Sequence, residues 1–157
     1  MDANNPPVAA TRHTLTRIAR DFSPAVFASS LAAEDMVLTD LILKAQLPIT
    51  IFSLETGRLH PETLAVLDKV KARYGYEVKL YKPQPEAVDA YIAQNGIDAF
   101  YNSVEMRKEC CRIRKVEPLG RALAGNKAWV TGQRRAQSAT RSSLEIQEDD
   151  PAHGMVK

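Results

Sequence analysis

The sequence predicts an α/β fold in which a parallel sheet carries helices on both faces. Three observations lead to this class. Short apolar runs alternate with segments of helical periodicity, turn residues separate the two kinds of segment, and the connections between them are short. Strands and helices that alternate in this way form right-handed crossovers, which build a parallel sheet covered on both sides.

The predicted elements follow one another in a regular order after a polar, turn-rich start. We expect residues 1–8 to be disordered and an amphipathic helix to run from Ala9 to Arg20. Predicted strands span residues 25–29, 49–54, 77–81 and 128–131, and predicted helices span residues 34–45, 61–74, 86–94 and about 111–124. Pro61 is typical of a first helical turn, and Gly75 and Gly96 are typical helix stops. The ordered domain is thus expected to cover residues 9–147, and residues 148–157 are expected to be frayed.

Composition sets limits on function. The 157 residues are 45% hydrophobic and 25% charged, which suits one domain that buries a core without disulfides. The 21 Lys and Arg against 19 Asp and Glu leave a net charge of +2, which is too small for a general nucleic-acid binder and favours a small anionic ligand. No apolar run approaches the roughly 18 residues of a membrane span, and a secretory signal pattern is absent. We therefore expect a cytoplasmic protein.

The loop after the first predicted strand is a candidate anion site. Ser29 and Ser30 precede a helix start, and two hydroxyls beside free helical N–H groups can hold phosphate or sulfate oxygens. The alternative is that these serines only cap the helix. A P-loop motif and a GxGxxG motif are both absent from the sequence, so neither of those nucleotide-binding classes is supported.

Two further loops follow predicted strands and carry polar groups. The first contains Glu55, Thr56, Gly57 and Arg58, where a tight turn at the glycine would let the neighbouring groups line a nucleotide pocket. The second spans residues 131–141 and carries Arg134, Arg135 and Arg141, whose guanidinium groups suit a phosphosulfate. Loops at the carboxyl ends of parallel strands meet at one edge of the sheet, so we expect these loops to converge with residues 29–35.

The two cysteines of the sequence, Cys110 and Cys111, are neighbours. On a helix they point about 100° apart, which suits a bulky metal cluster better than a disulfide. Arg114 and Lys115 each follow one of these cysteines by four residues and would place a cation on the same helix face. The alternative is a pair of packed free thiols beside a solvated basic face.

Four stretches together resemble the assimilatory adenylyl-sulfate (APS) reductase branch of the sulfonucleotide (APS and PAPS) reductases. They are SSLAAEDMVLTDL at 29–41, ETGRLHPET at 55–63, KECCRIRKVEPL at 108–119 and TGQRRAQSATR at 131–141. The resemblance extends from Phe22 to about Gln147. It implies an adenine nucleotide alpha hydrolase-like fold of the ATP pyrophosphatase type, with the serines of the first loop, residues 55–58 and the three arginines binding the substrate.

The resemblance also implies chemistry. Such enzymes reduce APS to sulfite and AMP in sulfate assimilation: a cysteine thiolate attacks the sulfur, AMP departs, and thioredoxin or a similar dithiol releases sulfite. A [4Fe–4S] cluster is held by the cysteine pair and a later Cys-x-x-Cys, and Lys115 stands where a basic residue links the cluster to the substrate sulfate. Enzymes for the 3′-phosphorylated substrate PAPS generally lack the pair, so APS is the expected substrate.

This sequence departs from the family pattern in two places. Ala32 stands where a glycine is usual, and no cysteine follows Cys111. The second half of the cluster ligands and the nucleophile are therefore missing, and we expect a C-terminally truncated chain that is inactive alone.

The sequence leaves two other interpretations open: a PAPS reductase, and a noncatalytic adenine-nucleotide module with a Cys-Cys redox or metal switch. A ligase or amidotransferase is disfavoured because an SGGxDS-like loop is absent. The expected partners are APS or AMP and a dithiol reductant, without nucleic acid or membrane; the sequence leaves a homo-oligomer open.

Overall fold

The computed structural model describes residues 6–134 and 144–157, and it contains a mostly parallel sheet of six strands. The strand order is β3-β2-β1-β4-β6-β5. The bounds are β1 (Ala25–Ala28), β2 (Ile49–Leu54), β3 (Lys79–Tyr81), β4 (Ala128–Thr131), β5 (Asp149–Asp150) and β6 (Met155–Val156). Only β5 is antiparallel to its neighbour among these pairs. The predicted parallel α/β sheet is confirmed.

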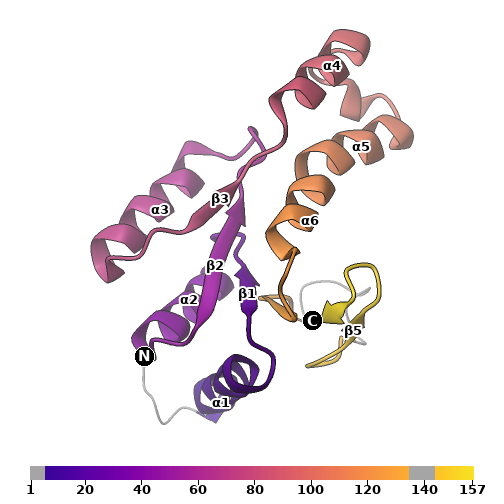
Figure 1. Ribbon diagram of the computed structural model, residues 1–157. Coiled ribbons are helices and arrows are strands. Elements are labelled where there is room, and N and C mark those ends of the chain that lie inside the picture. The colour runs from indigo at the N-terminus through magenta and orange to yellow at the C-terminus, as the bar shows by residue number, and fades with distance from the viewer. Residues whose placement is uncertain (1–5, 135–143) are drawn as a thin grey trace.

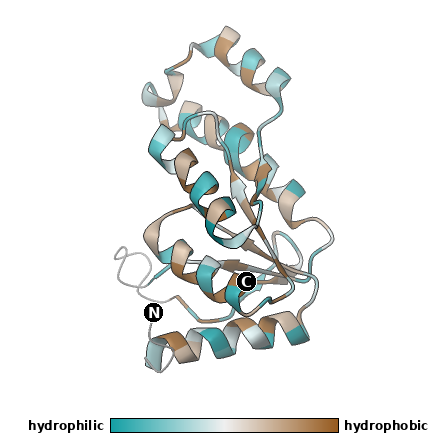
Figure 2. Cartoon of the chain, turned by 90° about the vertical axis from the view of Figure 1, so that its left-hand side faces the viewer, coloured by the Kyte–Doolittle hydropathy of each residue, from teal (hydrophilic) through white to brown (hydrophobic). Residues whose placement is uncertain are grey.

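Helices cover both faces because side chains of the central strands alternate between them (Figure 1). Phe27 of β1 and Ile51 of β2 point to one face and pack in the larger core with α1 (Pro6–Asp21), α2 (Ala33–Lys44) and α3 (Pro61–Tyr74). Val26 and Phe52 point to the opposite face and pack against α6 (Glu117–Leu123). In Figure 2 the strands are mainly hydrophobic and lie between helices of mixed character. The continuous apolar runs in the strands thus reflect burial of both faces of the sheet.

The segment between β3 and α6 projects beyond the carboxyl end of β2 and β3 (Figure 1). It consists of α4 (Pro85–Asn95), the 3₁₀ turn η1 (Ala99–Tyr101), α5 (Val104–Cys111) and η2 (Arg112–Val116), and it has a small core of its own around Tyr91, Ala99 and Ile113. The hydroxyl of Ser103 accepts a hydrogen bond from the Met106 N–H and so caps α5. The cysteine pair lies within this projecting segment, at the end of α5.

The helix around the cysteines is not a regular α-helix, unlike the predicted one. Residues Arg112–Val116 form a π-helix, η2, in which the Glu117 N–H bonds to the carbonyl of Arg112, five residues earlier. Pro118 has no N–H to give the carbonyl of Arg114, and its ring disfavours an α-helical turn at this point. Wider turns of this type are frequent at functional sites. The four-residue spacing from the cysteines to Arg114 and Lys115 therefore does not define a single helix face.

A buried polar contact ties α2 to α3. The Tyr74 hydroxyl donates to Oδ1 of Asp40 at 2.5 Å, and Lys44 Nζ donates to Oδ2 at 3.0 Å. Burial alone would raise the pKa of Asp40, but these hydrogen bonds and the lysine charge hold it below its usual value. Asp40 is therefore ionised and paired inside the fold.

Both ends of the described chain differ from the sequence-based expectation. Helix α1 begins at Pro6 rather than Ala9, since proline is compatible with a first helical turn. Residues 148–157, expected to be frayed, contain β5 and β6. The Glu148 and Lys157 backbones exchange hydrogen bonds of 2.7 and 2.8 Å, and Trp129 Nε1 donates to Asp150 at 2.9 Å. Such pairing leaves no periodic pattern in this stretch of ten residues. Within residues 6–134 and 144–157, none of the helices is long and apolar enough to cross a membrane.

Candidate functional site

The candidate site lies at the carboxyl edge of the parallel sheet. Strands β1, β2 and β4 run in the same direction, with Ala28 beside both Phe52 and Thr131. The loops that follow them therefore start at the same edge, and Ser29 N–H still bonds to the carbonyl of Phe52 at 2.8 Å. The expected convergence of residues 29–35 with the starts of the other two loops is observed.

The first loop is held by its own serines. Ser29 Oγ accepts from the Leu31 N–H at 3.1 Å, while the N–H and hydroxyl of Ser30 donate to Oδ2 of Asp35 at 2.6 and 2.5 Å. The N-cap of α2 is Ala32, and no side chain caps it. The serines thus shape the loop instead of capping the helix as N-cap residues. Ala32 has φ −78°, which any residue adopts, so its methyl group does not strain the loop.

Asp35 is the residue of this edge that sequence reasoning missed. It is 4% exposed, and its Oδ1 is buried without a hydrogen-bond partner in the described part of the chain. Gly132, just after β4, packs so closely that a Cβ atom there would lie 1.8 Å from Oδ1. An unpaired buried carboxylate oxygen is costly. The available signal was an acidic residue five positions after Ser30 at a helix start.

The arginines of the loop after β4, residues 131–141, which we call the fourth loop, are only partly described. Arg134 Nη2 lies 3.6 Å from Oε2 of Glu34, in the first turn of α2, so this arginine reaches the same edge as Asp35. Arg135 and Arg141 lie outside the described residues. The ion pair joins the first and fourth loops.

The loop after β2, residues 55–58, which we call the second loop, is bound to the projecting helical segment. Thr56 is buried, Gly57 adopts φ +72°, and the Gly57 N–H bonds to Oε1 of Glu55 at 2.7 Å. Arg58 stacks over Phe100, with its guanidinium carbon 4.9 Å from the ring centre, and donates to the carbonyl of Ile97. Arg58 therefore extends toward the helical segment. The sequence had predicted that this side chain lines a nucleotide pocket.

The cysteine pair lies at the end of α5. Cys110 is half-buried against the small core of the projecting segment, whereas Cys111 and Lys115 are exposed. Residues 6–134 and 144–157 contain no group of three or more His, Cys, Asp or Glu side chains arranged to hold a metal ion. A [4Fe–4S] cluster takes four protein ligands, and the sequence has two cysteines. The pair fits half of such a cluster, and this chain does not complete it.

The family model for the phosphoadenosine phosphosulfate reductase domain matches residues 24–157. The chain belongs to this reductase family. Among curated relatives, proteins named adenosine 5′-phosphosulfate reductase are 59% identical over 143 residues in Burkholderia cepacia and 50% identical over 149 residues in Allochromatium vinosum. These matches cover 91% and 95% of this chain but 57% and 58% of the relatives. The chain thus spans somewhat more than half the length of the relatives it matches.

A solved structure supports the fold of this reductase-family chain. The crystal structure of a phosphoadenylyl-sulfate reductase from Candida auris, in complex with phosphate, superposes with a TM-score of 0.76 over 99% of this chain and 78% of its own. The two sequences are 20% identical, so the likeness concerns the fold. It confirms the adenine nucleotide alpha hydrolase-like class expected from the resemblance.

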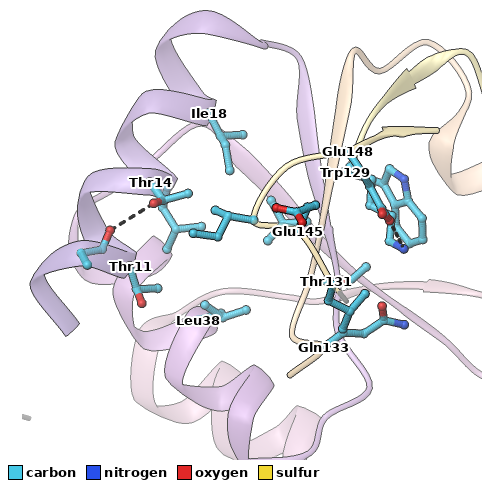
Figure 3. A pocket seen from close by; sticks show the side chains of 15 residues that line it. Thr11, Thr14, Ile18, Leu38, Trp129, Thr131, Gln133, Glu145 and Glu148 are labelled. Atoms are coloured by element: carbon cyan, nitrogen blue, oxygen red, sulfur yellow. Dashed lines mark hydrogen bonds and ion pairs between the residues drawn. The ribbon is translucent and has the colours of Figure 1, made fainter. Parts of the chain in front are cut away.

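A cavity of about 420 Å³ lies between α1 and β4 (Figure 3). Thr14 and Ile18 of α1 and Leu38 of α2 form one side, and Trp129 of β4 and Glu145 form the other. Its lining includes none of the residues 29–35 or 55–58. It does include Thr131 and Gln133, so in this reductase-family chain the cavity borders the start of the loop at residues 131–141.

Proposed function

We propose that this chain is the nucleotide-binding part of a thioredoxin-dependent adenylyl-sulfate reductase, which reduces APS to sulfite and AMP. One observation carries the location: a buried carboxylate oxygen of Asp35 lacks a partner in the described chain where the first and fourth loops meet. The similarity to proteins named adenosine 5′-phosphosulfate reductase supports the substrate class.

The loops offer complementary groups for the two ends of an adenylyl ligand. The Asp35 oxygen is an acceptor, which suits a ribose hydroxyl rather than an anion, and in the proposal Gly132 moves away from this oxygen when the ligand binds. Helix α2 is not capped by a side chain, so its first N–H groups can donate to phosphate or sulfate oxygens beside Ser29 and Ser30. In the proposal Arg134, Arg135 and Arg141 add guanidinium donors to the same end. On the side of the proposed site that faces the cysteines, the ligand would contact the second loop, with Glu55, Thr56, Gly57 and Arg58.

The sulfur chemistry requires a group that this sequence does not contain. A cysteine thiolate attacks the sulfur of APS and forms an S-sulfocysteine, the bond from sulfur to the AMP oxygen breaks, and a dithiol then reduces the adduct to release sulfite. We assign neither Cys110 nor Cys111 as that nucleophile. In the complete protein we propose them as two of the four ligands of a [4Fe–4S] cluster, with Lys115 as the electrostatic link to the substrate sulfate.

APS is favoured over PAPS because the relatives at 50–59% identity are named for APS and because the Cys-Cys pair is present. Vicinal cysteines without a disulfide are typical of a reducing compartment. We therefore propose a cytoplasmic enzyme with thioredoxin or a similar dithiol as its partner.

Calorimetric titration of the chain with AMP, GMP and inorganic phosphate tests the proposal. We expect AMP to bind more tightly than either control ligand. The variant Asp35→Asn should weaken AMP binding by about 10-fold or more, since a hydrogen bond to a charged group contributes roughly 1.5–3 kcal/mol. Asp68→Asn, on the exposed side of α3, is the matched control and should bind as wild type does. Equal affinity for AMP and GMP, or for wild type and Asp35→Asn, would contradict the proposed site.

A further inference from the structure

Two arginines link the second loop and the projecting helical segment in opposite directions. Arg58 leaves the loop and reaches the start of η1, where Nη1 lies 3.4 Å from Asp98 and Nη2 donates to the carbonyl of Ile97. Arg114 leaves the π-helix and reaches back to the loop, where Nη1 donates to the carbonyl of Thr56 at 2.7 Å. The loop and the segment are therefore fastened at two points.

The Arg114 contact is the more buried and more confined of the two. Arg114 is partly buried and Thr56 is 7% exposed, whereas Arg58 is exposed. The Arg114 Nη1 atom also lies close to Gly57, since a Cβ on this glycine would come within 3.1 Å of it. A guanidinium in this place fills the space above the glycine and fixes the adjacent carbonyl. A shift of the Arg114 guanidinium is therefore coupled to a shift of the second loop.

The same arginine stands four residues after Cys110, inside the π-helix that begins directly after Cys111. Its backbone is continuous with the cysteine pair, and its side chain ends on the loop that follows β2. Cys110 packs against the small core that contains Ile113, the neighbour of Arg114. The thiols and Thr56 are thus connected through Arg114, by its backbone on one side and its hydrogen bond on the other.

We propose that Arg114 is a positioning residue that couples the second loop to the cysteine pair. It holds Thr56 and Gly57 at a set distance from Cys110 and Cys111, so that a nucleotide which orders the loop also changes the surroundings of the thiols. The inference rests on the proposed function, because the ligand that orders the loop is an adenylyl nucleotide. It differs from the role given to Lys115, which acts through charge.

The labelling rate of the two thiols, measured with and without saturating AMP in metal-free protein, tests the coupling. We expect AMP to slow labelling of the wild-type protein by about fivefold or more, in the range of ordinary coupling between two sites. Arg114→Gln should abolish this protection. Arg114→Lys, which retains the charge and one donor group, should restore part of it.

Arg112→Gln is the matched control. Arg112 lies two residues away on the same helix but pairs with Glu109 on the surface at 2.7 Å, so this variant should keep the full protection by AMP. If Arg114→Gln fails to fold, Gly57→Ala gives the second test: its methyl group would crowd the guanidinium at 3.1 Å and its φ of +72° would strain the loop at this contact, so the protection should weaken.

The outcomes separate the two proposals. Wild-type protein that binds no AMP contradicts the proposed function itself. If wild-type protein binds AMP but its labelling rate does not change, only the coupling role of Arg114 is overturned. The same holds if AMP slows labelling as much in Arg114→Gln and Gly57→Ala as in the wild type.

Discussion

Replacing Gly132 by alanine tests whether the fourth loop must press against Asp35. The added Cβ would lie 1.8 Å from Oδ1, whereas ordinary contacts begin at 3.4 Å, so the loop or the carboxylate has to move by roughly 1.5 Å. Overpacking of this kind costs about 1–3 kcal/mol. A shift of Asp35 also weakens its two hydrogen bonds from Ser30, at roughly 1.5–3 kcal/mol for a charged acceptor.

The expected loss for Gly132→Ala is therefore about 2–5 kcal/mol, or a factor of roughly 30 or more in the ratio of folded to unfolded protein. Urea denaturation followed by circular dichroism measures it. Gly120→Ala is the matched control: this position lies inside α6 with nothing within 4 Å of the added methyl, so stability should rise by about 0.5–1 kcal/mol. If Gly132→Ala were as stable as wild type, the close approach of Gly132 and Asp35 would be refuted.

Three further predictions concern stability, the cluster and the arginines. The pKa of Asp40 is lowered in the folded state, so its contribution to stability is present above about pH 4, near the unfolded pKa, and is lost as pH falls through the folded value. Tyr74→Phe should therefore flatten that acid slope in urea titrations, and an unchanged slope would contradict it. Incubated with iron and sulfide, the 157-residue chain should hold no stable [4Fe–4S] cluster, which iron analysis measures. With thioredoxin present it should release no sulfite from APS. A sulfo-adduct on Cys110 or Cys111, detected by intact-mass measurement, would show that the nucleophile is not missing from this chain. Arg141→Lys keeps the charge but loses the guanidinium fork, so AMP or APS affinity should drop in titrations; unchanged binding in alanine variants of Arg141 and its two companion arginines would remove that hypothesis.

The sequence predicted the central strands well because their signal is local. The runs at 49–54 and 128–131 are short, apolar and bounded by turn residues, and both strands have the predicted bounds. Helix α3 also has its predicted bounds, because Pro61 opens it and Gly75 ends it in the left-handed conformation. Where one residue type determines the local backbone, sequence reasoning was sufficient.

The features that sequence reasoning missed depend on contacts between distant parts of the chain. Asp35 acquires its unusual environment only when Gly132 closes on it, and Arg114 meets Thr56 across 58 positions of sequence. The π-helix depends on Pro118, whose effect inside a helical stretch can equally be a kink or a break. Such properties follow from tertiary packing and leave no periodic signal.

Amide hydrogen exchange of the chain with and without AMP tests the central claim most directly, because it locates the ligand. The account predicts slowed exchange in residues 29–36, where the first turn of α2 offers its N–H groups, and in residues 55–58. The cavity between α1 and residues 144–148 should show no change. Protection confined to α1 and residues 144–148, with residues 29–36 unaffected, would contradict an adenylyl site at the carboxyl edge of the sheet.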